Sequence, residues 1–329
     1  MKILVTGSAG HLGEALIRTL KKTGDQPIGL DIKPSEYTDC VGSIADRGFV
    51  RECIAAADAV IHAATLHKPH VGTHSRQDFI DTNISGTLNL LEEAVANDCQ
   101  SFIFTSTTST FGDAMRPAAG EPAVWVTEEL PPKSKNIYGV TKSAAEDLCR
   151  LFHRNTGLPC LVLKTSRFFP EDDDQKDQRD AFDGDNLKVN ELLFRRADID
   201  DIVAAHRLAL DKAKAIGFDR FIVSATPPFK IDDAAQLGTD AAAVVQRYVP
   251  EYVDEYARRN WQMFPTIGRV YDNTRARTLL GWEPQYTFQY AIRCLRAGED
   301  YRSPLAREIG SKGYHEDEFE EGPYPVQGF

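Results

Sequence analysis

A glycine-rich turn close to the N-terminus constrains the fold of this chain more than any other feature. Gly7, Gly10 and Gly13 lie between a short β-type run over Lys2 to Thr6 and a helical pattern that starts at Leu12. Gly7 permits a tight turn, Gly10 lets a pyrophosphate approach the backbone, and Gly13 allows the helix to pack closely on the strand. The helix N-terminus adds free N–H groups and a partial positive charge. The turn therefore predicts a dinucleotide-binding unit.

Strand and helix patterns alternate through the first half of the 329-residue chain. Strand patterns occur at residues 2–6, 27–31, 58–63, 101–106, 161–163 and 218–224, and helical patterns at 12–22, 78–96, 138–156 and 200–213. Short strands that alternate with helices favour right-handed βαβ units and a parallel sheet buried on both faces. The predicted fold is α/β, a Rossmann doubly wound parallel sheet with the dinucleotide lying across the strand ends.

A small, discontinuous C-terminal substrate lobe is expected beside this sheet, because the texture of the sequence changes after Arg167. We predict that residues 1–167 and 198–225 form the dinucleotide-binding domain, and that residues 168–197 and 226–329 form the lobe. The lobe ends in an acidic, then Gly- and Pro-rich tail at residues 315–329. Two units agree with the usual allowance of about 150 residues per domain.

Asp31 ends the second predicted strand, 18 residues after Gly13. A carboxylate at this place can accept both ribose hydroxyls of the adenosine half of a dinucleotide, and it would repel a 2′-phosphate. Asp31 therefore favours NAD over NADP. The alternative is that it only caps a loop.

Tyr138 and Lys142 open the helical pattern at 138–156. Their i, i+4 spacing places the phenol and the ammonium on one helical face. A nearby cation stabilises a phenolate, so Lys142 is expected to lower the pKa of Tyr138. Tyr138 could then take a proton from a substrate alcohol while a hydride leaves the same carbon. A Tyr-x-x-x-Lys pair is common on helices, so its meaning depends on its context.

Charge and cysteine content exclude several other classes of function. The chain has 38 Lys and Arg against 49 Asp and Glu, a net charge of −11 that disfavours nucleic-acid binding. No apolar run approaches the ~18 residues needed to cross a bilayer, and the apolar stretch after Lys2 is too short for a signal peptide. The six scattered cysteines form no CxxC pair, which indicates free thiols in a reducing cytoplasm.

A metal site is not expected. His67, His70 and His74 follow the predicted strand at 58–63 in a loop that could cover a substrate. Their spacing is irregular, and no carboxylate or cysteine completes a ligand set.

Further motifs lie in the second half of the chain. They are the segments 198–203 (Asp-Ile-Asp-Asp-Ile-Val), 272–274 (Asp-Asn-Thr) and 280–284 (Leu-Gly-Trp-Glu-Pro). Together with the glycine turn and the Tyr138–Lys142 pair, they make the chain resemble the extended short-chain dehydrogenase/reductase family, the NAD-dependent sugar epimerases and dehydratases. The resemblance runs from Met1 to about Leu163 and resumes at Asp198.

The resemblance implies a catalytic group of three residues. Tyr138 would be the acid/base, and Lys142 would orient the nicotinamide ribose. Thr107, counted back from Gly112, would hold the substrate oxygen against Tyr138. Residues 105–110 are all Thr or Ser, so Ser106 and Thr108 remain alternatives for this third position.

The resemblance also implies where NAD would bind. The cofactor-binding residues would be Gly7, Gly10, His11, Leu12, Gly13, Asp31, Ser43, Ile44, Ala63, Ala64, Thr65, Asn83, Thr105, Tyr138, Lys142 and Thr165. Asp46 would lie near the adenine. The Asn-x-x-Gly-Thr segment at 83–87 would be largely structural. A homodimer is implied as well, with helices 78–96 and 138–156 paired across a four-helix bundle.

The reaction follows from the substrate half. Dehydratases of this family carry Thr-Asp-Glu where this chain has Thr107, Thr108 and Ser109, so dehydration is disfavoured. Only 27 residues, 171–197, lie between Pro170 and Asp198, which leaves little protein to hold a nucleoside diphosphate. This short segment resembles uronate dehydrogenases, which also place a Pro-Glu pair here.

We therefore expect NAD-dependent hydride transfer at a secondary alcohol of a sugar or nucleotide-sugar, of the epimerase type. A uronate-type dehydrogenase that releases NADH is the first alternative, and a non-catalytic NAD-binding regulatory protein is the second. The candidate substrate contacts are Lys68, Thr108, Arg167, Lys176 and Arg179. The last three could meet a substrate carboxylate, arginine best of all, or they could neutralise the acidic run at 172–174.

Overall fold

The computed structural model describes residues 1–118, 120–173 and 175–313. Its main sheet has seven strands in the order β3-β2-β1-β4-β5-β7-β8, and every pairing in it is parallel. The strands are β1 (Lys2–Thr6), β2 (Gln26–Asp31), β3 (Cys40–Val41), β4 (Ala59–His62), β5 (Ser101–Thr107), β7 (Cys160–Thr165) and β8 (Phe218–Val223). This sheet confirms the predicted Rossmann-type α/β fold. The predicted tail at 315–329 lies outside the described residues.

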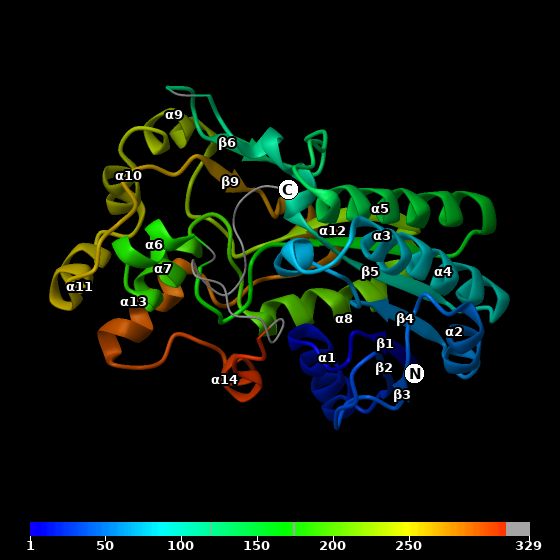
Figure 1. Cartoon of the computed structure of the whole chain (residues 1–329). Helices are drawn as coiled ribbons and strands as arrows, with labels where there is room; N and C mark the ends of the chain where they lie inside the picture. Colours follow the sequence, from blue (N-terminus) through cyan, green and yellow to red (C-terminus); the bar gives the residue numbers. More distant parts are fainter. Residues whose placement is uncertain (119, 174, 314–329) are drawn as a thin grey trace.

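Helices cover both faces of the sheet, as Figure 1 shows. One face carries α1 (His11–Lys22), α8 (Ile199–Ile216), α12 (Thr274–Leu280) and α14 (Pro304–Ile309). The other face carries α2 (Arg47–Ile54), α4 (Gly86–Ala96) and α5 (Ile137–Thr156). Side chains alternate between the faces along each strand, so Ile3 and Val5 pack toward α1 while Leu4 packs in the opposite cluster. The sheet is therefore buried on both sides, as its apolar strands predict.

The predicted helix at 78–96 is longer and less regular than its pattern indicates. It begins as α3 (Arg76–Phe79), continues through a π-helical segment, η2 (Ile80–Ser85), and ends as α4. Ser75 and Asp78 form a capping box at its start. The π segment carries Asn83 and turns its side chain toward the loop after β4. A periodic apolar pattern alone does not reveal such an insertion.

A second group of elements lies to the left of the sheet in Figure 1. Its helices are α6 (Lys176–Ala181), α7 (Gly184–Glu191), α9 (Ala234–Leu237), α10 (Ala241–Tyr248), α11 (Tyr252–Arg259) and α13 (Phe288–Ala297). A two-stranded parallel sheet joins β6 (Val124–Val126) to β9 (Arg269–Tyr271), a pairing that no local sequence pattern predicts. Short 3₁₀ turns are η1 (Lys68–Gly72), η3 (Thr108–Phe111), η4 (Asp113–Met115) and η5 (Ile231–Asp233).

This second group has its own hydrophobic core, which includes Val189, Leu237 and Phe288. Helices α12 and α14 follow residue 225 in the chain but pack on the sheet, against α8 and α1. The division of the chain into two domains at the boundaries given above stays a prediction.

Candidate functional site

A cleft of about 1170 Å³ lies along the carboxyl ends of the parallel strands. This is where open α/β sheets bind their ligands. Of the predicted cofactor-binding residues, the following line it: Gly7, Gly10, His11, Leu12, Gly13, Asp31, Ser43, Ile44, Ala63, Ala64, Thr65, Thr105, Tyr138 and Thr165. Asn83, Lys142 and Asp46 are not among the lining residues. The cleft also takes in residues without a sequence prediction, among them Lys312 and Gly313 near the end of the described chain.

The glycine turn has the close backbone contacts that its sequence predicts. Gly7 has φ +75°, and a Cβ atom there would lie 2.8 Å from the Ala64 nitrogen. A Cβ atom on Gly13 would lie 2.0 Å from the Gly7 carbonyl oxygen. Gly10, the N-cap of α1, has no side chain that could cap the helix, and the first-turn amides of a helix have no intrahelical partner. These features fit a pyrophosphate group.

Asp31 stands at the wall of the cleft and also fixes the turn. Its carboxylate accepts hydrogen bonds from the Ala9 amide at 3.0 Å and from the Lys33 amide at 2.9 Å. Nearby, Asp46 caps α2 by accepting from the Phe49 amide at 3.1 Å. Asp46, expected beside the adenine, thus does not line the cleft, because its side chain is directed to the N-terminus of α2.

Asn83 lies behind the cleft rather than in it. Its side-chain oxygen accepts from the Thr65 hydroxyl and the Leu66 amide, both at 2.9 Å. Its amide group donates to the Leu66 carbonyl at 2.9 Å and to the Thr141 hydroxyl at 3.0 Å. Asn83 is 2% exposed, so it ties the loop after β4 to α5, in line with the structural role that the resemblance implies for its segment.

The hydroxyl groups at the end of β5 point in different directions. Ser106 donates to the buried Glu146 carboxylate at 2.5 Å, and the Thr105 hydroxyl is 2.8 Å from His206 Nε2. The Thr108 hydroxyl is 3.5 Å from the Thr165 carbonyl oxygen. Thr107 accepts from the Ser109 amide at 3.1 Å, and its hydroxyl also interacts with the phenol of Tyr138. The Ser106 hydroxyl is therefore occupied, while that of Thr107 lies beside Tyr138.

Tyr138 and Lys142 occupy different surroundings. Tyr138 lines the cleft at 8% exposure. Burial raises the pKa of Tyr138 to about 12, and the Thr107 hydroxyl opposes this rise. Lys142 is 2% exposed, donates to the Thr105 carbonyl at 2.6 Å, and lies 3.9 Å from the centre of the Phe104 ring. Burial lowers the pKa of Lys142 to about 7.

The expected lowering of the Tyr138 pKa by Lys142 is not a feature of this structure. Lys142 is not among the groups that shift the pKa of Tyr138, and its ammonium is bonded to the Thr105 carbonyl instead. The two side chains do share one helix, one turn apart, as the spacing predicts.

A buried polar network lies beneath these residues. Lys164 donates to the Glu146 carboxylate at 2.6 Å and to the Thr110 hydroxyl at 2.7 Å. Arg220 Nε lies 3.3 Å from the other oxygen of Glu146. Sequence reasoning missed this network, although Glu146 follows Lys142 by four residues and so shares its helical face. The network anchors Ser106, between Thr105 and Thr107.

The other end of the cleft is cationic. Among its described lining residues are Arg116, Lys135, Arg167, Arg195 and Arg269, whereas only Asp31 and Asp78 are acidic. The predicted contacts Lys68, Thr108 and Arg167 line the cleft. Sequence reasoning missed Arg195 and Arg269, whose only signal was their place shortly before the motifs at 198–203 and 272–274.

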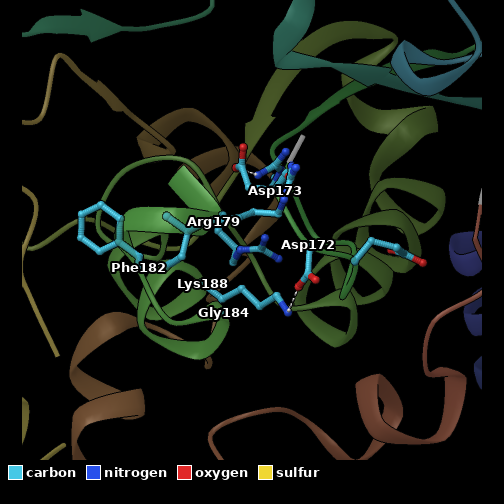
Figure 2. Close-up of a pocket in the computed structure, with 10 residues that line it drawn as sticks. Asp172, Asp173, Arg179, Phe182, Gly184 and Lys188 are labelled. Carbon is cyan, nitrogen blue, oxygen red and sulfur yellow. Dashed lines mark hydrogen bonds and ion pairs between the residues drawn. The ribbon is translucent and has the colours of Figure 1, made fainter. Parts of the chain in front are cut away.

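Lys176 and Arg179, both predicted to contact the substrate, are not among the residues that line this cleft. Lys176 is exposed and forms an ion pair with Asp180 at 2.5 Å. Arg179 donates to the Asp173 carbonyl at 2.5 Å and borders a separate pocket of about 100 Å³, together with Phe182 and Lys188 (Figure 2). For Lys176 the alternative is favoured, since it neutralises an acidic neighbour on the surface.

His11 joins the glycine turn to two distant segments. Its Nε2 atom lies 2.9 Å from the Glu171 carboxylate, which follows β7. Glu171 also accepts from the Ser311 hydroxyl at 2.9 Å and from the Lys312 amide at 3.1 Å. Burial alone would raise the pKa of Glu171, but His11 and the hydrogen bond from Ser311 help to hold it at about 2. The contact brings the end of the described chain against the turn.

Two further features bear on function. The rings of His67, His70 and His74 contact one another, but within residues 1–118, 120–173 and 175–313 no group of three or more His, Cys, Asp or Glu side chains is arranged to hold a metal ion. No helix in the same part of the chain is long and apolar enough to span a membrane.

Comparison with known proteins adds to this geometry. A sequence profile described as the NAD dependent epimerase/dehydratase family matches residues 3–191. Over 316 residues the chain is 26% identical to the low-salt glycan biosynthesis protein Agl12 of Haloferax volcanii. The alignment covers 88% of this chain and 95% of that protein. It is 28% identical over 172 residues to UDP-glucose 4-epimerase 2 of Oryza sativa subsp. japonica, but this match spans only 46% of this chain and 40% of that protein.

The fold has close counterparts among solved structures. A short-chain dehydrogenase/reductase superfamily protein from Agrobacterium tumefaciens with bound NAD superimposes with a TM-score of 0.64 at 22% identity, covering 94% of this chain and 99% of the other. The family is NAD-dependent, and the glycine turn and Asp31 fit that cofactor. Since the profile matches more than half of its length, the chain belongs to the NAD-dependent epimerase/dehydratase family.

Proposed function

We propose that this protein transfers a hydride at a secondary alcohol of a sugar or nucleotide-sugar, with Tyr138 as the acid/base and an epimerase-type outcome. The observation that carries the proposal is the pairing of the Tyr138 phenol with the Thr107 hydroxyl inside the cleft that the glycine turn also lines. A phenol and a hydroxyl side by side can hold one alcohol oxygen between them, which is the geometry that proton abstraction needs.

Each residue has a role in this proposal. Thr107 fixes the substrate oxygen, and Tyr138 takes its proton. Lys142 would stabilise the phenolate and hold the cofactor ribose once its ammonium had turned from the Thr105 carbonyl. NAD, when bound, supplies the acceptor for the hydride. Because burial holds the pKa of Tyr138 at about 12, the reaction requires added positive charge near the phenol to lower that pKa.

Dehydration has less support. It needs a carboxylic acid near Tyr138 to protonate the leaving hydroxyl. Residues 107–109 carry only hydroxyls. The acidic side chains among the described lining residues are Asp31, which is bonded to the glycine turn, and Asp78, which is bonded to Ser75.

The first alternative is a uronate-type dehydrogenase. The cationic residues at the far end of the cleft favour it, because they could meet a free sugar acid. Purified protein should be incubated with NAD and separate panels of uronates and UDP-sugars. Sugar isomers formed without net NADH support the epimerase. Growing absorbance of NADH supports the dehydrogenase. NAD binding without turnover on either panel supports a regulatory protein.

The variant Tyr138→Phe tests the acid/base assignment. It should lose turnover while its affinity for NAD stays close to that of the wild type. Tyr290→Phe is a matched control, because Tyr290 is a half-buried tyrosine on α13, outside the cleft. If Tyr138→Phe were as active as the control, the assignment would be wrong.

We also propose a homodimer in which α4 and α5 pair with their counterparts. Val140 and Leu151 on α5 are 51% and 39% exposed, and covering such apolar side chains with a partner helix would be favourable. Light scattering after gel filtration should give twice the chain mass, and Leu151→Asp should weaken the dimer. A reducing cytoplasm is our proposed location, since all six cysteines are free thiols.

A further inference from the structure

Two arginines in the cleft have guanidinium groups with unused hydrogen-bonding capacity. Arg269 lies on β9, and Arg195 follows α7; both line the cleft. The Nε atoms of both are buried and have no hydrogen-bond partner. The side chain of Arg269 has no hydrogen bond or ion pair with any of the described residues. A buried polar group without a partner is destabilising, and a ligand in the cleft could supply the partner that these two Nε atoms lack.

The two guanidinium groups face the same side chain. The Arg195 guanidinium carbon lies 5.4 Å from the centre of the Phe194 ring, and that of Arg269 lies 5.8 Å from it. The backbone holds this arrangement, because the Tyr271 amide donates to the Phe194 carbonyl at 3.3 Å. Both guanidinium groups are therefore held in place before a ligand binds, because Arg269 lies on strand β9 and Arg195 follows the hydrogen-bonded Phe194.

Neighbouring charges compensate Arg195 but not Arg269. Arg195 forms ion pairs with Glu191 at 2.7 Å and with Asp173 at 3.5 Å. Burial lowers the pKa of Arg195, Glu191 opposes this, and the nearby Arg167 and Arg269 lower it further. Arg269 has no carboxylate of its own among the described residues. It adds a positive charge to a wall that already carries several.

Two further cationic residues line the same cleft. Arg116 and Lys135 line the same cleft, and Lys135 has Asp113 as its partner at 3.3 Å. Burial lowers the pKa of Lys135, and both Arg116 and Arg269 contribute to this lowering. This concentration of positive charge occurs in a chain with a net charge of −11. The positive charge of the cleft favours an anionic ligand by long-range attraction as well as by hydrogen bonding.

We propose that Arg195 and Arg269 bind an oxyanion of the substrate, a carboxylate or a phosphate carried by the sugar. Arginine suits this role, because its planar fork matches the two oxygens of either group. The inference rests on the proposed function in one respect, that the anion belongs to the sugar substrate. It makes Arg269 a specificity-determining residue that selects acidic sugars over neutral ones.

Binding measurements on the NAD-loaded protein test this. Titration calorimetry would compare galacturonate, galactose 1-phosphate and UDP-galactose with neutral galactose. Arg269→Met is the main variant, because removing a residue without an ion pair leaves no carboxylate uncompensated. Arg269→Lys keeps the charge but loses the fork. Arg293→Met is the matched control, an exposed arginine on α13 outside the cleft.

The wild type should bind at least one anionic sugar more tightly than galactose. Arg269→Met should weaken that binding by about 10- to 150-fold, the usual worth of hydrogen bonds to a charged group. Arg269→Lys should fall between, and Arg293→Met should match the wild type. Whether galacturonate or the phosphorylated sugars lose affinity identifies the anion as a carboxylate or a phosphate.

Equal binding of every anionic sugar by wild type and Arg269→Met would overturn the proposal, as would galactose binding as tightly as the best anionic sugar. Failure of the proposed function is a separate result. It would show as unchanged turnover in Tyr138→Phe, whatever the sugar affinities of the arginine variants.

Discussion

Gly13→Ala should damage the cofactor site more than any other single-methyl change in the glycine turn. The added Cβ would lie 2.0 Å from the Gly7 carbonyl oxygen, 2.6 Å from the Gly7 carbonyl carbon and 2.7 Å from the Ser8 Cα. All three atoms belong to the backbone, so no side chain can rotate away. Ordinary contacts are longer than about 3.4 Å, so the turn or the helix must move by more than about 1 Å.

The movement has two measurable costs. Overpacking of this kind destabilises by about 1–3 kcal/mol, and each kcal/mol lowers the Tm by about 2–4 °C in proteins of some 200 residues. The shift also displaces the Gly7 carbonyl, which accepts from the Gly10 amide at 3.0 Å. Loss of one hydrogen bond to a pyrophosphate weakens NAD binding by at least about tenfold.

Thermal denaturation and calorimetric titration with NAD would measure both effects. Gly10→Ala should be milder, since its Cβ would meet the Gly7 oxygen at 3.3 Å. Gly48→Ala is the matched control in α2, where the nearest atom is an Asp46 side-chain oxygen at 3.3 Å. Wild-type Tm and NAD affinity in Gly13→Ala would refute the close-packing argument.

Three other perturbations test separate parts of the structure. Asp31→Arg should weaken NAD and admit NADP, measured as two dissociation constants; an unchanged preference would remove Asp31 from the cofactor site. The Glu171 pKa of about 2 lies below its unfolded value of about 4.3. The ionised Glu171 carboxylate therefore contributes stability above about pH 4.3, and this contribution is lost as the pH falls toward 2. The Tm difference between wild type and Glu171→Gln should shrink over that interval. A constant Tm difference would argue against the link to His11. Trp282→Ala should cost about 3–5 kcal/mol in a denaturant titration, because Trp282 is 1% exposed and donates to the Asp201 carbonyl at 2.9 Å; a loss below 1 kcal/mol would contradict that packing.

The main sheet was predictable because its strands are buried on both faces and so read as short apolar runs. Other elements carry no such local signal. The two-residue β3 is too short for a period, and the β6–β9 pair joins Val124 to Arg269, residues far apart in the chain. Their pairing is a tertiary effect, which a single segment cannot reveal.

The site divides in a similar way. The glycine turn was recognisable from its spacing between a strand pattern and a helical pattern. Tyr138 was recognisable from its spacing to Lys142 together with the family resemblance. Arg269 belongs to no spacing pattern, and only the fold brings it beside Arg195. Lys176 and Arg179 do not line the cleft, and a charged run in a sequence does not indicate which of its side chains face a site.

The contacts of His11 place the end of the described chain at the edge of the predicted cofactor cleft, which Lys312 and Gly313 also line. Lys312 forms an ion pair with Glu14 on α1, and its backbone is bonded to Glu171. A dehydrogenase must exchange its spent dinucleotide in every cycle, whereas an epimerase can keep one molecule for many cycles. Since Lys312 and Gly313 line the cleft, we expect that weakening the contacts of residues 311–313 shortens the residence time of NAD.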